Sequence, residues 1–245
     1  MSFDPAAAAE DLVADLRPLC VPGRAAQEKR YLKSELDFLG VPLPGVRRTV
    51  LAHIRKYGEL DAETVVAWAL ALWAGNLWER RVAAVELLSA RVAVLTPDDL
   101  ATVEDLIRAG AGWALVDPLS GTVAGRIGLA HRDAWPLIDK WARDEDFWVR
   151  RAALLALLPG IRAGRPDYGR FERYATPMLG EKEFFIRKAI GWVLRELSKK
   201  DAGYVAAWTG THLREMSGVT FREAVRRLPP DDARQLTAKR STVTP

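Results

Sequence analysis

FFIRKAIGWVLREL, residues 184–197, begins with two aromatic side chains and continues as an apolar helical pattern that carries basic residues. In four other segments an aromatic residue likewise opens an apolar helical pattern that usually carries basic residues. The aromatic residues that open the five segments are Trp78, Trp113, Trp148, Phe185 and Phe221, separated by 35, 35, 37 and 36 residues. A period in the middle thirties with two helical patterns per period is typical of stacked helix-turn-helix units.

This period predicts an all-α protein, a right-handed superhelical solenoid of HEAT-like helix-turn-helix repeats, also called an α-α superhelix. Because each unit buries its apolar face against its neighbours, we expect a single domain over residues 1–230, with a concave face that binds an extended partner. A short C-terminal tail, residues 231–245, is expected to be partly disordered. The expected helices cover residues 6–19, 25–38, 46–56, 62–72, 76–91, 98–108, 118–130, 133–142, 146–158, 168–178, 183–199, 203–208 and 218–228.

Composition excludes several classes of protein. The chain has 245 residues, of which 49% are hydrophobic, which is ample for a core. Cys20 has no cysteine partner, and the three histidines lie far apart, so neither a disulfide nor a metal site nor a cofactor is expected. The sequence contains no signal-peptide pattern and no long apolar stretch, which predicts a cytoplasmic protein without a membrane partner. We expect a monomer, since no heptad seam is present.

Charge is informative through its distribution. Thirty-six basic and thirty-two acidic residues leave a formal net charge of only +4, which is weak evidence for nucleic-acid binding. Basic doublets nevertheless recur, several at equivalent places in the repeat, where they would stack into a stripe that binds phosphates. The alternative is that they are ordinary solvated helix surface. The doublets are Arg47-Arg48, Arg80-Arg81, Arg150-Arg151, Arg187-Lys188, Lys199-Lys200 and Arg226-Arg227.

Trp192 lies among cations on its helix. Lys188, Trp192, Arg195 and Lys199 follow one another at steps of four, three and four residues, which places them on one face. An indole between ammonium and guanidinium groups is a stacking platform of the kind found in nucleic-acid grooves. The alternative is that Trp192 only packs between helices.

The segment at Trp148 offers a second candidate for DNA binding. Arg151 lies three residues after Trp148, and we expect its guanidinium to face the groove and hold a phosphate without reading the base sequence. Trp148 itself is most simply explained as packing between repeats.

The segment at Trp113 differs from its relatives because Asp117 stands where the other repeats are apolar or basic. A carboxylate in a basic groove weakens binding to a polyanion, so it is expected to stabilise positive charge that develops on a substrate. Two geometries remain open. Asp117 followed by Pro118 is a good helix N-cap. If the helix instead begins near Trp113, the indole and the carboxylate lie one turn apart on one face.

From about Ala25 to Leu228, the chain resembles the bacterial DNA alkylation repair glycosylases built from HEAT-like repeats. The resemblance is carried by residues 184–196, by residues 147–153, by Trp113 with Val116-Asp117, and by residues 30–33 and 38–40. The chain departs from the family pattern at two positions. Ala114 stands where the family often has a second acid, and Pro42 stands where it often has glutamine.

The resemblance implies roles for individual residues. Asp117 matches the catalytic carboxylate, and Trp113 and Trp192 match two tryptophans that contact the deoxyribose of the damaged nucleotide. The remaining matches and basic residues are expected to bind DNA. They are Arg151, Arg195, Tyr31, Lys188 and Arg48.

The implied activity is hydrolysis of the N-glycosidic bond of cationic N3- or N7-alkylated purines in double-stranded DNA. It leaves an abasic site and needs neither base flipping nor a metal. Two other functions stay open on the sequence alone. One is a non-catalytic HEAT-repeat protein that binds damaged or structured DNA, and the other is a protein-binding scaffold.

Overall fold

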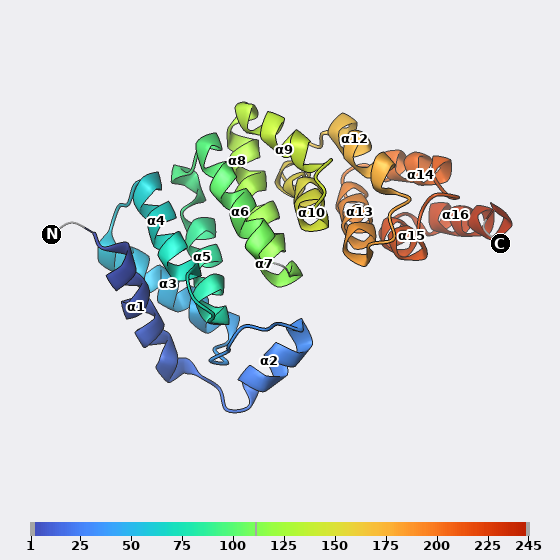
Figure 1. Ribbon diagram of the computed structural model, residues 1–245. Helices are drawn as coiled ribbons and strands as arrows, with labels where there is room; N and C mark the ends of the chain where they lie inside the picture. Colours follow the sequence, from blue (N-terminus) through green and yellow to red (C-terminus); the bar gives the residue numbers. More distant parts are fainter. Residues whose placement is uncertain (1–2, 111, 244–245) are drawn as a thin grey trace. The chain divides into compact units, whose positions relative to one another are not determined.

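The computed structural model describes residues 3–110 and 112–243, in which the regular elements are helices (Figure 1). The extended pairing found in these ranges is an isolated bridge between Asp37 and Leu77. The fold class expected from the repeat, an all-α protein of helical repeats, is confirmed. The chain divides into two compact units, residues 1–119 and 120–245, and the expected single domain stays a prediction.

The first unit is built on four helices that pack together, α1, α3, α4 and α5. Trp68 of α4 is fully buried in this core. Helix α2 differs from the others because none of its residues is buried. The helices of the unit are α1 Pro5–Leu16, α2 Arg24–Leu32, α3 Leu43–Tyr57, α4 Ala62–Trp73, α5 Trp78–Ala90, α6 Leu100–Gly110 and α7 Trp113–Asp117.

In the second unit α10, α13 and α15 pack one after another, while α12 and α14 pack against them, as expected for repeated helix pairs (Figure 1). Trp141 and Phe171 are fully buried. After the π-helical turns Pro118–Ala124, at which the units meet in the sequence, the helices are α8 Gly125–Ala130, α9 Trp135–Trp141, α10 Phe147–Ala156, α11 Leu158–Arg162, α12 Tyr168–Met178, α13 Phe184–Leu197, α14 Ala202–Thr211, α15 Gly218–Val225 and α16 Pro230–Val243.

The aromatic residues that define the period lie at the starts of helices. Trp78 and Trp113 are the first residues of α5 and α7, and Trp148 and Phe185 are the second residues of α10 and α13. Local caps fix several of these starts: an oxygen of Asp146 accepts a hydrogen bond from the backbone N–H of Trp148 at 2.8 Å. At α10 and α13 the start of the helix is therefore set by short-range sequence signals.

Helix α2 is shorter than expected. It ends at Leu32 instead of continuing to residue 38, because Lys33 adopts a left-handed conformation with φ of 51°. Asp37 then pairs with the start of α5: its N–H donates to the carbonyl of Asn76 at 2.8 Å, and its own carbonyl accepts from Trp78 N–H at 2.8 Å. Contacts with a distant segment thus replace the last helical turns.

The C-terminal segment also differs from its expectation. Residues 231–245 were predicted to be a partly disordered tail, but residues 231–243 belong to α16, Pro230–Val243, and residues 244–245 lie outside the described residues. Leu236 is buried, and the guanidinium of Arg240 donates to the carbonyls of Leu213 at 2.9 Å and Met216 at 2.7 Å. These long-range contacts anchor a helix whose own sequence is mostly polar.

Candidate functional site

Asp117 lies inside helical structure. Helix α7 begins at Trp113, after Gly112 in extended conformation, and Asp117 is its last residue. The helix does not start at Pro118, so the N-cap interpretation of Asp117 is wrong. Asp117 stands four residues after Trp113, which places the indole and the carboxylate one turn apart on the same face. The Asp117 side chain is half-buried, and Trp113 is 37% exposed.

Tyr31 joins Trp113 although 81 residues separate them in the sequence. Their ring centroids lie 6.1 Å apart with an interplanar angle of 88°, an edge-to-face contact. Tyr31 belongs to the exposed helix α2 and is itself 72% exposed. The sequence-predicted residues Tyr31, Trp113 and Asp117, which we call the Trp113 cluster, therefore share one surface of the first unit.

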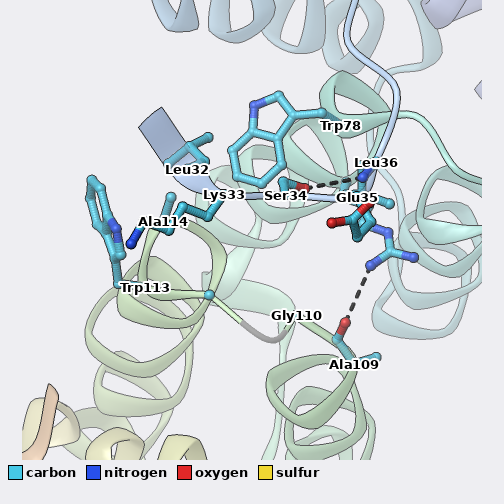
Figure 2. A pocket seen from close by; sticks show the side chains of 12 residues that line it. Leu32, Lys33, Ser34, Glu35, Leu36, Trp78, Ala109, Gly110, Trp113 and Ala114 are labelled. Atoms are coloured by element: carbon cyan, nitrogen blue, oxygen red, sulfur yellow. Dashed lines mark hydrogen bonds between the residues drawn. The ribbon is translucent and has the colours of Figure 1, made fainter. Parts of the chain in front are cut away.

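Two pockets flank Trp113. One, of about 290 Å³, lies between the segment that follows α2 and the starts of α5 and α7. Figure 2 shows the rings of Trp78 and Trp113 on separate sides of this pocket, with Leu32 and Lys33 between them. The second pocket, of about 390 Å³, lies between α2, α3, α5 and α7 and is lined mainly by apolar side chains. Trp113 thus stands at the edge of a hollowed surface.

Glu79 secures the segment that links α2 to α3. Its side chain is completely buried at the start of α5. Its carboxylate accepts hydrogen bonds from the backbone N–H groups of Leu39 at 3.0 Å, Gly40 at 2.7 Å and Val41 at 3.1 Å. Three charge-assisted bonds to one carboxylate are strong and directional. Glu79 therefore fixes the position of the segment that follows α2, the helix that carries Tyr31.

Trp192 lies on α13 with basic side chains on both sides. The indole is half-buried, which agrees with neither a fully packed core residue nor a freely exposed one. Lys188 and Arg195 both reach Glu223 of α15: the Lys188 ammonium lies 2.5 Å from Oε1, and the Arg195 guanidinium donates to Oε2. We call Lys188, Trp192, Arg195 and Glu223 the Trp192 cluster.

The environment of Glu223 keeps it ionised. Burial raises the pKa of this carboxyl group, but the hydrogen bond from Lys188 and the positive charges of Arg195, Lys188 and Arg226 outweigh that effect. The net result is a pKa below the ordinary value. At neutral pH the cluster therefore holds a carboxylate between cations.

Arg151 differs from its expectation. It was predicted to face a groove and hold a phosphate, but its side chain is only 2% exposed. Its guanidinium donates to the carbonyl of Phe185 at 2.5 Å and lies over the Phe185 ring, 5.7 Å from the centroid. Arg151 thus joins α10 to α13 through a charge-assisted hydrogen bond to the main chain and a cation–π contact with the Phe185 ring.

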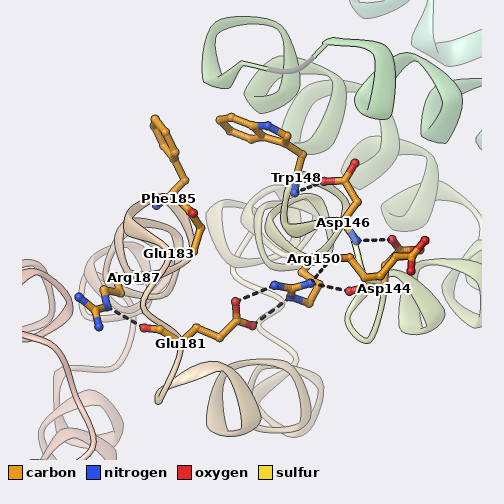
Figure 3. A network of polar contacts seen from close by, with 9 residues as sticks. Asp144, Asp146, Trp148, Arg150, Glu181, Glu183, Phe185 and Arg187 are labelled. Atoms are coloured by element: carbon orange, nitrogen blue, oxygen red, sulfur yellow. Dashed lines mark hydrogen bonds and ion pairs between the residues drawn. The ribbon is translucent and has the colours of Figure 1, made fainter.

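Trp148 packs between repeats, as the sequence indicated. Its ring lies 4.8 Å from that of Phe185 and 4.7 Å from that of Phe147. Figure 3 shows Trp148 and Phe185 next to each other at the starts of α10 and α13. Below them Arg150 makes a two-point contact with Glu181, at 3.0 and 2.7 Å. This region is a junction between repeats.

Members of several other basic doublets also make contacts within the protein, which leaves them less available for the expected stripe of phosphate-binding groups. Their guanidinium groups donate to main-chain carbonyls, and the residues are half-buried. Arg48 of α3, by contrast, is exposed and stays a candidate for DNA binding. The arginines with such carbonyl contacts are Arg80 to Ala71, Arg81 to Ala109, Arg150 to Asp144 and Arg187 to Glu181.

The Trp113 cluster and the Trp192 cluster belong to different units, so their convergence on one substrate stays a prediction.

Sequence reasoning missed Glu79 and Glu223. Glu79 directly follows Trp78, and Glu223 stands two residues after Phe221. An acid so close to the aromatic residue that opens a repeat could have indicated these two positions.

Among the described residues no group of three or more histidine, cysteine, aspartate or glutamate side chains is arranged to hold a metal ion. In the same ranges no helix is long and apolar enough to cross a membrane.

Comparison with known proteins adds family evidence. A family model described as "DNA alkylation repair enzyme" matches residues 12–228. No curated protein matches the chain.

Solved structures share the fold. A predicted DNA alkylation repair enzyme from Enterococcus faecalis is 23% identical, with a TM-score of 0.78 over 86% of this chain and 97% of its own. AlkD2 from Streptococcus mutans is 18% identical, with a TM-score of 0.53 over 90% of this chain and 97% of its own. The smu.31 protein of Streptococcus mutans UA159 gives the same identity and TM-score over 90% of this chain and 98% of its own.

Proposed function

Because the chain belongs to the DNA alkylation repair enzyme family, we propose that it is a DNA glycosylase acting on cationic N3- or N7-alkylated purines. It hydrolyses the N-glycosidic bond in double-stranded DNA, without flipping the base, and leaves an abasic site. Water is the second substrate, and no cofactor takes part.

One observation carries this proposal. The carboxylate of Asp117 and the exposed indole of Trp113 occupy one face of α7, a turn apart, and Tyr31 makes an edge-to-face contact with the indole. An exposed tryptophan beside a carboxylate contributes little to a hydrophobic core. The pair can instead stabilise positive charge that develops on a bound substrate.

The chemistry follows from the charge of the substrate. Alkylation at N3 or N7 makes the purine cationic, so the base leaves as a neutral molecule and needs no general acid. Cleavage builds positive charge on the sugar. A preorganised carboxylate at Asp117 stabilises that charge by about 3 to 4 kcal/mol, the magnitude typical of such electrostatic groups. It also orients the attacking water.

The sequence resemblance assigns to the damaged nucleotide two tryptophans, one in each unit. The ring faces of Trp113 and Trp192 present electron density to the developing cation and to the sugar hydrogens. Lys188 and Arg195 beside Trp192, together with Arg48 on α3, bind backbone phosphates. Arg151 acts indirectly, because its contact with Phe185 secures α13, which carries Trp192.

A base-release assay tests this function. A duplex carrying a single 7-methylguanine is incubated with the protein, and the released base and the abasic site are measured. We expect release well above the spontaneous rate for the wild type, and for Asp117→Asn a rate lower by about 100-fold or more, the cost of removing a preorganised electrostatic group.

DNA binding provides the control for the same experiment. Asp117→Asn removes a negative charge, so affinity for an undamaged duplex should stay the same or rise. If wild type and Asp117→Asn release the base at the same slow rate while both bind DNA, the protein is a non-catalytic DNA-binding member of its family and the proposed glycosylase activity is wrong.

A further inference from the structure

Glu223 is a nearly buried carboxylate directly beneath the face of α13 that carries Trp192. Its side chain is 9% exposed. Besides the contacts with Lys188 and Arg195, a guanidinium nitrogen of Arg226 lies 3.9 Å from its Oε2. Arg195 and Lys188 keep 22% and 42% of their side chains exposed, so they are held from within the protein and still reach solvent.

Gly191 creates the space for this arrangement. A Cβ atom at position 191 would lie 2.6 Å from Cβ of Glu223 and 3.2 Å from the carbonyl of Thr220. Helices α13 and α15 therefore approach each other closely at Gly191 and Glu223. Lys188, Gly191 and Arg195 are spaced by three and four residues along α13, so both cations extend along the helix toward a carboxylate placed over the glycine.

Two cations seven residues apart are about 10 Å apart along a helix axis. Without a common partner, their long side chains would sample many rotamers and would repel each other. Bridging by one carboxylate removes most of this freedom before DNA arrives. A preorganised charge costs less to use at the moment of reaction than one that must first be ordered.

We infer that Glu223 is a positioning residue that holds the Lys188 ammonium and the Arg195 guanidinium on either side of Trp192, so that the damaged nucleotide meets a preformed indole flanked by two phosphate-binding groups. This inference rests on the proposed glycosylase function for its effect on rate. Glu223 itself touches neither the DNA nor the reacting atoms.

Glu223 is expected to lower the affinity of this surface for DNA. A carboxylate close to a phosphate backbone lowers affinity, and its removal adds one unit to the net positive charge of the surface. A positioning role therefore predicts opposite effects on two quantities, because loss of Glu223 preserves or strengthens DNA binding while it slows base release. A merely structural role predicts that both decline together.

The test compares Glu223→Gln with the wild type. Single-turnover base release from a 7-methylguanine duplex is measured with enzyme in saturating excess, and binding of the undamaged duplex is measured over a range of salt concentrations. We expect base release to slow at least tenfold. The dissociation constant for undamaged DNA should stay within threefold of the wild type or decrease.

Glu181→Gln is the matched control. It removes another carboxylate of the second unit that pairs with an arginine across the junction between repeats (Figure 3). Its base-release rate, measured on folded protein, should equal that of the wild type. If Glu223→Gln releases the base as fast as the wild type, or if Glu181→Gln loses as much activity, the positioning role is overturned.

A chemical readout separates this inference from the proposed function. Modification of Lys188 by an amine-reactive reagent, followed by mass spectrometry, reports how firmly the ammonium is held. We expect Lys188 to react at least threefold faster in Glu223→Gln, with exposed Lys182 unchanged. Absence of base release in the wild type alone would overturn the glycosylase proposal, whereas an unchanged Lys188 rate would overturn the positioning role of Glu223 even in an active enzyme.

Discussion

At the scale of single residues, the two acids that matter most for positioning are both buried and both bind several donors. Glu79 accepts three backbone N–H groups, and Glu223 binds the side chains of Lys188 and Arg195. A buried carboxylate is stable only when such partners replace water. Each acid therefore ties a functional segment to a neighbouring helix: Glu79 the segment after Tyr31, and Glu223 the helix of Trp192.

Glu79→Gln tests the first of these ties. A glutamine offers one carbonyl oxygen and two N–H donors, so it leaves at least one backbone N–H of residues 39–41 without an acceptor. We expect a loss of roughly 2 to 4 kcal/mol in the free energy of unfolding, measured by urea denaturation with tryptophan fluorescence. Hydrogen exchange of these backbone N–H groups should also become faster.

The comparison for Glu79 is Glu86→Gln. Glu86 lies on the same helix and makes a two-point contact with Arg47, whose side chain is 54% exposed. Exposed ion pairs contribute about 1 kcal/mol or less. Equal losses of stability in the two variants would show that Glu79 has no special role in holding the segment.

At the scale of helices, the close approach of α13 and α15 depends on the absence of a side chain at Gly191. Gly191→Ala would force Cβ to within 2.6 Å of Cβ of Glu223, and neither helix backbone can yield cheaply. We expect a lower melting temperature, with a cost of about 1 to 3 kcal/mol, as is usual for overpacking. Scanning calorimetry gives the measurement.

Gly203→Ala is the matched control, since Gly203 also lies in a helix, and its added Cβ would meet only Asp201 Oδ1 at 3.6 Å, an ordinary contact. Alanine favours helix more than glycine does, so this variant should melt at or above the wild-type temperature. A Gly191→Ala protein that also melts at or above the wild-type temperature would contradict the steric argument.

Helix α2 shows how distant contacts alter a local pattern. Periodicity predicted a helix to residue 38, but Lys33 takes a left-handed conformation and Asp37 pairs with the segment before α5. The helix keeps Tyr31 at the surface, where it meets Trp113. The helical pattern indicates where a helix can form. The backbone hydrogen bonds of Asp37 with Asn76 and Trp78 favour an extended segment in place of the last turns of α2.

At the scale of the whole molecule, charged networks make stability depend on pH. Burial raises the pKa values of Glu223 and Asp139, but hydrogen bonds and nearby arginine and lysine charges outweigh it, and both pKa values are lowered. A carboxyl group with a depressed pKa in the folded state stabilises the fold above its unfolded pKa. That stabilisation is lost as the pH falls through the folded pKa.

The melting temperature should therefore decline as the pH falls below the unfolded pKa of glutamate, about 4.5. Thermal melts of the wild type and Glu223→Gln between pH 7 and pH 3 measure this. The variant cannot lose the ionised form of Glu223, so its decline should be shallower. Parallel curves for the two proteins would show that Glu223 contributes nothing to acid sensitivity.

The sequence by itself determined the class of fold and the positions of the repeats. Aromatic residues mark the starts of α5, α7, α10 and α13, and the side chains of Asp146 and Glu183 cap the last two of these helices. These signals act within a few residues, so periodicity finds them. The recurrence of an aromatic residue at the same place in each repeat also explains why the packing of Trp148 between repeats was predicted correctly.

Tertiary structure alone decided which polar side chains are available for function. It buried Arg151 against Phe185, paired Lys188 and Arg195 with Glu223, brought Tyr31 to Trp113, and placed Asp117 within a helix instead of at its cap. Most of these contacts join residues about 28 to 82 positions apart. Their formation depends on how closely neighbouring helices pack and on which buried donors and acceptors must be satisfied there, and neither quantity is present in the local sequence.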